Sequence, residues 1–175
     1  AFSHIDGDAF SGMSEVKKGE MCGEVVINEI LKKFDLPVTV SVVVGDIDPG
    51  ALGNKNLVKI ARSMFKLPNV EPASHTYSHP FYWDPEYKQK NRYEKHHINI
   101  PKYSFDLEKE IDYSIHYISE KLSPKEKPCK IFLWSGNCEP LESHIARCDD
   151  LGVFNMNGGD TIYDDVDNSY TSVAP

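Results

Sequence analysis

The chain has 175 residues, 40% of them hydrophobic, which is enough for one domain with a buried core. Its formal net charge of −8 at pH 7 argues against a nucleic-acid backbone as a partner. The sequence contains no apolar run of about 18 residues, so it predicts no membrane-spanning helix. Both ends resemble interrupted strands, and we therefore expect residues 1–175 to be a single domain, a fragment of a longer protein.

The four cysteines, Cys22, Cys129, Cys138 and Cys148, include no C-x-x-C pair, so a structural zinc site is not expected. An even number of cysteines permits disulfides in an oxidising compartment without requiring them. Cys138 and Cys148 are the first pair to test for a disulfide. All four are equally consistent with buried free thiols.

The first half of the chain alternates between apolar runs and helical patterns. Its clearest strand, at 38–44, is almost continuously apolar and β-branched, which is typical of a parallel strand covered on both faces. Its clearest helix, at 54–66, has one apolar face and begins at Asn54, a favourable capping residue. The other predicted elements are a buried strand at 2–5, a helix at 22–35, a loop at 45–50 and a strand at 69–73.

The second half continues this alternation after a long irregular segment at 80–103, a length that usually indicates function or mobility. Strands that alternate with helices predict right-handed crossovers and a parallel sheet or barrel. His96, His97 and His144 are interpreted as surface residues. The predicted elements are a helix at 107–122 capped by Asp106, a strand at 131–134, a helix at 139–151, a strand at 153–157 and a sixth strand from residue 172.

Polar clusters follow four of the predicted strands. Because the carboxyl ends of parallel strands meet at one face of a β/α structure, we expect these clusters to converge there and to form the site. The clusters are Asp6 with Asp8, His75 with His79, Ser135-Gly136-Asn137, and Gly158-Gly159-Asp160.

His75 and His79 are four residues apart, and such a pair can point both imidazoles at one spot if the backbone turns helically between them. Two neutral imidazoles and one carboxylate are a common set of zinc ligands that leaves a position for water. Thr76 stands where the zinc-protease motif H-E-x-x-H has its glutamate base, so a base must come from elsewhere. Asp6 and Asp8 offer one metal ligand and one base. The alternative interpretation is that all four are solvated loop residues, since Asp-Gly pairs favour turns.

Aromatic residues follow His79 almost directly, among them Tyr82 and Trp83. Flat rings suit the apolar face of a sugar, but they can equally pack beneath a loop. The sequence favours neither interpretation.

Four blocks of the sequence match the motifs of a known family: His4-Ile5-Asp6-Gly7-Asp8, Ala73-Ser74-His75-Thr76-Tyr77-Ser78-His79-Pro80-Phe81, Phe132-Leu133-Trp134, and Asn155-Met156-Asn157-Gly158-Gly159-Asp160-Thr161. They resemble the polysaccharide deacetylases, the NodB-like group of carbohydrate esterase family four. The closest resemblance is to the deacetylase domains that modify the Pel exopolysaccharide. It covers nearly the whole chain, and the histidine block and the Asn-Met-Asn-Gly-Gly-Asp block are its most specific parts.

The resemblance implies an α/β fold, a deformed (β/α) barrel of the polysaccharide deacetylase type that is incomplete at its C-terminus. It implies a divalent metal, usually Zn²⁺, held by Asp8, His75 and His79, with Asp6 as general base. The implied reaction is the metal-dependent de-N-acetylation of a hexosamine-containing exopolysaccharide in the periplasm or outside the cell. The implied partners are that acetylated polysaccharide and the exopolysaccharide secretion machinery. The candidate substrate-binding residues are Tyr82, Trp83, Trp134 and Asp160.

The sequence departs from the family pattern at two points. The third motif of typical members carries an arginine that orients the base, but here the strand ends in Leu133-Trp134-Ser135-Gly136. The last motif supplies a histidine as general acid, and we expect this group to lie beyond Pro175. Since general acid catalysis is typically worth ~10²–10⁴-fold, the sequence predicts metal binding with weak turnover.

Three other functions stay open. The missing groups are consistent with a catalytically weak carbohydrate-binding domain of the same fold. The same ligands also suit another metal-dependent amidohydrolase that acts on a cyclic amide or an ester. The third alternative is a structural β/α domain without a metal.

Overall fold

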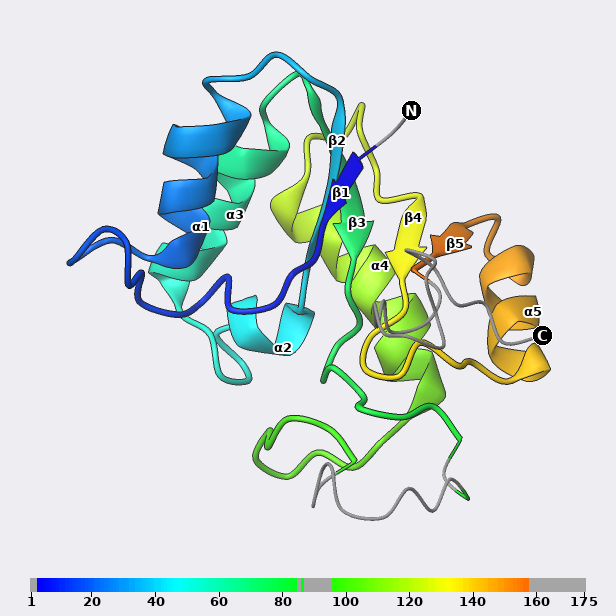
Figure 1. Cartoon of the computed structure of the whole chain (residues 1–175). Helices are drawn as coiled ribbons and strands as arrows, with labels where there is room; N and C mark the ends of the chain where they lie inside the picture. The colour runs from blue at the N-terminus through cyan, green and yellow to red at the C-terminus, as the bar shows by residue number, and fades with distance from the viewer. Residues whose placement is uncertain (1–2, 85, 87–95, 158–175) are drawn as a thin grey trace, which may run out of the picture.

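The computed structural model describes residues 3–84, 86 and 96–157 (Figure 1). Five parallel strands form one sheet in the order β1-β2-β3-β4-β5. Each strand therefore lies beside the strand that follows it in the chain, and the crossover helices share one side of the sheet. The strands are β1 (Ser3–Ile5), β2 (Val38–Val42), β3 (Val70–Ser74), β4 (Ile131–Leu133) and β5 (Phe154–Met156).

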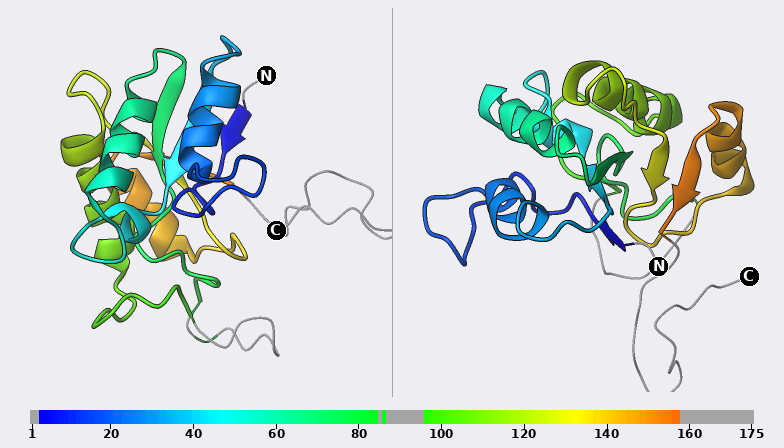
Figure 2. Two further views of the ribbon diagram at one scale, coloured as in Figure 1. Left: turned by 90° about the vertical axis from the view of Figure 1, so that its left-hand side faces the viewer. Right: turned by 90° about the horizontal axis from the view of Figure 1, so that it is seen from above.

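The consecutive strand order makes the sheet curl into a half-barrel, because no strand order reversal sends helices to the other face. Seen from above, the helices form an arc outside the curved sheet (Figure 2, right). This confirms the predicted α/β fold with parallel strands. The helical elements are α1 (Cys22–Val25), η1 (Val26–Leu31), α2 (Val44–Ile47), α3 (Lys55–Phe65), η2 (Lys109–Tyr113), α4 (Ser114–Tyr117), η3 (Ile118–Leu122) and α5 (Glu142–Asp150).

The predicted helix at 54–66 is confirmed as α3. The side-chain oxygen of Asn54 accepts hydrogen bonds from the backbone N–H groups of Asn56 and Leu57, which satisfies two donors of the first turn. One face of α3 is buried against the sheet, and the residues on it are Leu57, Ile60, Ala61, Met64 and Phe65.

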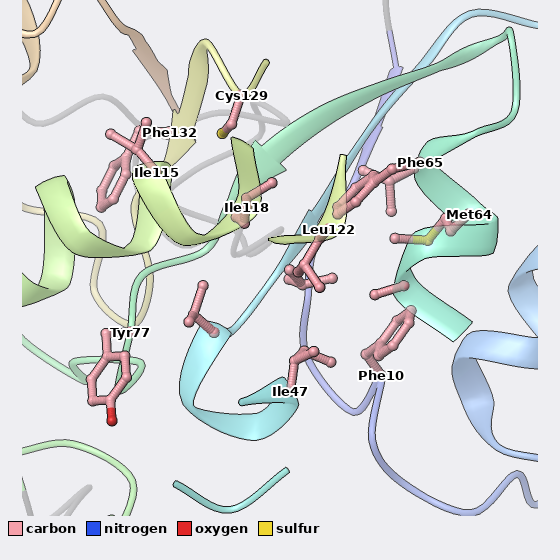
Figure 3. Close-up of a cluster of buried hydrophobic side chains, with 14 of the residues drawn as sticks. Phe10, Ile47, Met64, Phe65, Tyr77, Ile115, Ile118, Leu122, Cys129 and Phe132 are labelled. Atoms are coloured by element: carbon pink, nitrogen blue, oxygen red, sulfur yellow. The ribbon is translucent and has the colours of Figure 1, made fainter. Parts of the chain in front are cut away.

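The predicted helix at 107–122 is continuous through η2, α4 and η3, and it is the crossover between β3 and β4. Its first turn is capped by Asp106, whose carboxylate accepts the backbone N–H of Lys109 at 3.2 Å. Ile115, Ile118 and Leu122 from this helix meet Phe132 of β4 and Phe65 of α3 in the core (Figure 3). Apolar packing between the helix arc and the sheet therefore holds the strand ends in place.

Several local predictions were wrong. The segment at 2–5 was expected to be a buried strand, but Ser3 and His4 are exposed, because β1 is an edge strand of the described sheet that pairs only with β2. The expected loop at 45–50 overlaps helix α2, which begins at Val44, two residues after the end of β2. The sixth strand expected from residue 172 lies outside the described residues.

The three histidines interpreted as surface residues are not freely exposed. His144 is 5% exposed, and its ring lies 5.6 Å from that of Trp83. His96 and His97 are half-buried, and the ring of His96 packs against Tyr82. Apolar and polar residues are mixed in the short helix that contains His144. The sequence pattern therefore does not reveal which side of this helix faces the core.

All four cysteines lie in the described part of the chain and form no disulfide, so Cys138 and Cys148 are not bonded to each other. Burial raises the pKa of the Cys129 and Cys148 thiols to about 12, which keeps both protonated at neutral pH. Within the described part of the chain, no helix combines the length and the apolar character needed to cross a bilayer.

Candidate metal centre

The carboxyl end of β1 passes into the tight turn Asp6-Gly7-Asp8. Gly7 is buried, and a Cβ atom added there would lie 2.7 Å from the Cα atom of Val42. Only glycine allows the turn to approach the end of β2 this closely. The close approach places the carboxylates of Asp6 and Asp8 at the edge of the sheet where β2 and β3 also end.

The segment after β3 supplies the two histidines through a turn and not through a helix. The backbone N–H of His75 donates to the carbonyl of Val42 at 3.0 Å, which extends the sheet pairing by one residue. Thr76 and His79 have positive φ values of 73° and 53°, a left-handed conformation that costs a non-glycine residue about 1–3 kcal/mol. The hydroxyl of Thr76 accepts the N–H of His79 at 2.8 Å and closes the turn. This turn brings the imidazoles together without the helical geometry that the sequence suggested.

A buried carboxylate holds this turn from the side of the crossover helix. Glu110 is fully buried, and one of its oxygens accepts the backbone N–H groups of Tyr77 at 2.9 Å and Ser78 at 2.8 Å. Its other oxygen accepts the hydroxyl groups of Ser78 and Tyr103. Burial raises the pKa of the Glu110 carboxyl, and the hydrogen bonds from Ser78 and Tyr103 oppose this increase. Sequence reasoning missed Glu110, because its spacing gave no sign that this helix residue reaches the histidine turn.

Asp8, His75 and His79 form a candidate metal-binding triad. One ligand atom from each residue lies within 4.8 Å of the other two. The Nε2 atoms of His79 and His75 lie 2.9 Å and 3.5 Å from the same oxygen of Asp8. The side chains of His75 and His79 are 2% and 13% exposed, respectively, whereas that of Asp8 is 61% exposed. The triad is therefore buried on the histidine side and opens to solvent on the carboxylate side.

The donor chemistry of the triad fits a transition-metal ion. The carbonyl of Leu133, at the end of β4, lies 3.1 Å from Nδ1 of His75 and can only accept a hydrogen bond. This contact assigns a proton to Nδ1, so Nε2, which faces Asp8, is the atom that would bind a metal once it carries no proton. A tautomer fixed in this way is the usual arrangement for a histidine that binds a metal.

The charges in the triad shift the pKa values of its members in opposite directions. Hydrogen bonds from His75 and then from His79 hold the pKa of Asp8 well below its usual range. Burial lowers the pKa of His79, but the hydrogen bond and the charge of Asp8 outweigh it, and the net effect raises that pKa above 6.5. The Asp8 carboxylate is thus ionised at neutral pH, as a metal ligand must be.

A third carboxylate faces the triad from α2. Asp46 is half-buried and accepts the hydroxyl of Ser11 at 3.3 Å. Burial raises the pKa of Asp46, while the charge of His79 lowers it and the charge of Asp8 raises it. Asp46 is therefore close enough to the triad to interact with it electrostatically. Asp46 lies two residues after the strand predicted at 38–44, so the rule that sites form at strand ends could have identified it.

Asp6, the predicted base, is exposed beside the triad. Its oxygen Oδ2 accepts a hydrogen bond from the side-chain amide of Asn157 at 3.4 Å. β1 and β5 are the first and last strands in the sheet order. Asp6 follows β1 and Asn157 follows β5, so this contact joins the residues that come after the two outermost strands. The curl of the sheet is what brings the two ends together.

The predicted substrate-binding residues differ in their accessibility. Trp83 is fully buried and Trp134 is 3% exposed, and their rings pack edge to face at 4.7 Å, so neither ring offers a face to solvent. The burial of Trp83 agrees with the packing interpretation of the aromatics that follow His79, and the indole N–H groups of Trp83 and Trp134 donate to Ser135 and Asn155 inside the fold. Tyr82 is half-buried. Asp160 lies outside the described residues.

The aromatic ring beside the triad belongs to Phe81. Its centroid lies 5.4 Å from that of His79, in an edge-to-face arrangement, and the residue is only partly buried. Phe81 was part of the aromatic run noted in the sequence, but that run alone does not show which ring turns towards the histidines.

Comparison with known proteins gives no family assignment. No protein-family model matches the chain, and no curated protein matches it. The functional argument therefore depends on the geometry of this site and on the motifs that the sequence carries.

Proposed function

We propose that this chain is a zinc-dependent deacetylase that removes acetyl groups from a hexosamine-containing exopolysaccharide, on a barrel of the polysaccharide deacetylase type. The observation that carries the proposal is the meeting of Asp8, His75 and His79 beside a separate carboxylate, Asp6, at the carboxyl ends of parallel strands. Three ligands and one free base are the groups that hydrolysis of an amide by activated water requires.

The openness of the site supports a polymeric substrate. Asp6 and Asp8 are both exposed, so a sugar within a long chain can approach them from solvent. Phe81 adds partly exposed aromatic surface next to His79, which suits the apolar face of a pyranose ring. A polymer-modifying role places the domain in the periplasm or outside the cell, in contact with the exopolysaccharide secretion machinery.

In this proposal the residues divide the work between binding and proton transfer. Asp8, His75 and His79 hold the ion, which when bound would lower the pKa of water from ~15.7 towards ~7 and polarise the acetamide carbonyl. Asp6 accepts the proton from the attacking water. The water oxygen bonds to the acetyl carbon, the carbon–nitrogen bond breaks, and the sugar nitrogen takes up a proton from solvent as it leaves. The products are acetate and a free amino sugar.

The first experiment measures zinc content and acetate release together. We expect about one equivalent of zinc per chain and release of acetate from acetylated hexosamine oligomers. His79→Ala should lose zinc and activity together, with a loss of zinc affinity of more than about 100-fold, because even residues outside the ligand set typically contribute 10–100-fold. Asp6→Asn should keep zinc and lose activity.

The outcomes separate the proposal from its alternatives. Zinc and sugar binding without acetate release would support a carbohydrate-binding domain of the same fold. Zinc binding with hydrolysis of cyclic amides or esters, but not of acetylated sugars, would support another amidohydrolase. An unchanged zinc affinity in both His79→Ala and Asp8→Ala would contradict the metal centre itself.

A further inference from the structure

The side-chain amide of Asn157 connects three strand ends. Its Nδ2 atom donates to the backbone carbonyl of Trp134, after β4, at 2.8 Å and to Oδ2 of Asp6, after β1, at 3.4 Å. An amide NH₂ group has two hydrogens, so it can serve both acceptors at once. Asp6 and Asn157 are 151 positions apart in the chain.

The position of Asn157 is fixed by the neighbouring strands. Leu133 pairs with Met156, and the N–H of Trp134 donates to the carbonyl of Met156 at 3.0 Å, so the sheet pairing reaches as far as Asn157. The preceding asparagine, Asn155, accepts the indole N–H of Trp134 at 3.0 Å. The buried tryptophan is therefore held on its backbone and on its ring, and its carbonyl is a rigid anchor for the amide of Asn157.

The backbone conformation at this position suits asparagine. Asn157 has a φ of +79°, in the left-handed region that asparagine tolerates better than most residues. Its short side chain starts from a backbone that has turned out of the strand. An amide anchored at Trp134 then has its second N–H directed at Asp6.

We propose that Asn157 is the positioning residue that orients the carboxylate of Asp6. This inference rests on the proposed function, in which Asp6 is the general base. An exposed aspartate side chain can rotate freely, and a donor on Oδ2 restricts that rotation and leaves Oδ1 to receive the proton of the attacking water. The segment Leu133-Trp134-Ser135-Gly136 has no arginine for this task, and the amide of Asn157 takes that role without adding a positive charge.

The contact itself is tested without metal or substrate. The side-chain amide signals of Asn157 are assigned in a ¹H–¹⁵N spectrum of the metal-free protein by their loss in Asn157→Asp. In Asp6→Ala these signals should shift, whereas those of Asn28, an exposed asparagine on η1, should stay in place. Unchanged Asn157 signals in Asp6→Ala would overturn the proposal.

The role in catalysis is tested with two variants that keep the backbone conformation. Asn157→Gly removes the donor and suits a positive φ, and Asn157→Asp keeps the shape of the side chain but offers no N–H. Each should lower kcat by about 100-fold, as a misplaced catalytic group does, with KM and zinc affinity nearly unchanged. Asn28→Asp adds the same charge away from the site and should leave kcat unchanged.

A loss of zinc affinity that matches the loss of kcat in both variants would assign Asn157 a structural role and contradict the positioning role. An unchanged kcat in Asn157→Gly would contradict it as well. If the wild-type protein releases no acetate, the deacetylase proposal fails, and the amide signals still decide whether Asn157 holds Asp6.

Discussion

The two halves of the candidate site are built in different ways. The histidine turn after β3 is buried, and Glu110 fixes its backbone through hydrogen bonds to Tyr77 and Ser78. The aspartate turn after β1 lies on an edge strand and exposes both carboxylates. The structure thus places the two histidines of the candidate triad in the core and the two aspartates at the surface.

The difference shows how the fold resolves a conflict between rigidity and access. Metal ligands must be held in one geometry before the ion arrives, and burial with satisfied hydrogen bonds provides this. Under the proposed function, a polymer must reach the base and an open coordination position, and an edge strand provides that access. Each turn also depends on one residue that tolerates no substitution easily, Glu110 for the histidines and Gly7 for the aspartates.

The largest effect is expected from removing Glu110. Glu110→Ala leaves three buried donors without this acceptor, the backbone N–H of Tyr77 and the backbone N–H and hydroxyl of Ser78, and each unsatisfied donor costs about 1–3 kcal/mol. We expect the free energy of unfolding to fall by about 3 kcal/mol or more, measured by urea denaturation of the metal-free protein. Zinc affinity should fall as well, because the turn that presents His75 and His79 loses its support.

Glu108→Ala, an exposed glutamate on the same helix, is the matched control for Glu110 and should change little. Glu110→Gln should be milder than Glu110→Ala, since the amide oxygen can still accept the two backbone N–H groups and the hydroxyls can reverse their direction. If Glu110→Ala and Glu108→Ala were equally stable, the histidine turn would not depend on the buried carboxylate.

A smaller effect is expected on the aspartate side from Gly7→Ala. The added methyl group would lie 2.7 Å from the Cα atom of Val42, so the turn must move away from β2. Overpacking of this kind typically costs about 1–3 kcal/mol, and it should lower the melting temperature. Because the turn carries Asp8, zinc affinity should fall by more than the change in stability alone suggests. Zinc titrations of the folded variant test this, and an unchanged affinity would show that the aspartate turn does not need its close contact with β2.

The smallest effect concerns the pH dependence of zinc binding. The ion must displace the proton of His79, whose pKa is raised above 6.5 by Asp8, so the apparent affinity should increase by up to about tenfold per pH unit until the pH passes that pKa. Above that pKa, His79 is neutral and this contribution to the pH dependence ends.

In Asp8→Asn the pKa of His79 should fall, because the carboxylate that raised it is gone. The midpoint should therefore move to lower pH, and calorimetric titrations between pH 5 and 8 measure it. A midpoint that stays in place would mean that Asp8 does not control His79.

The sequence alone was sufficient for features that depend on local patterns. The apolar face of α3, its cap at Asn54 and the parallel character of β2 follow from residue types at short spacing. The meeting of His75 and His79 with an aspartate of the first turn was also predicted, because ligand residues that follow strands of a parallel sheet lie at one edge. The choice of Asp8 over Asp6 as the ligand came from the family resemblance.

Only the tertiary structure decided which distant side chains meet. The burial of Trp83, the support of the histidine turn by Glu110 and the contact between Asn157 and Asp6 all join segments that are far apart in the chain. The local pattern of apolar and polar residues does not predict these contacts, because they depend on how far the sheet curls and on the register in which its strands pair. The curl of the sheet brings the ends of β1 and β5 together, and this places the amide of Asn157 within hydrogen-bond distance of the exposed Asp6.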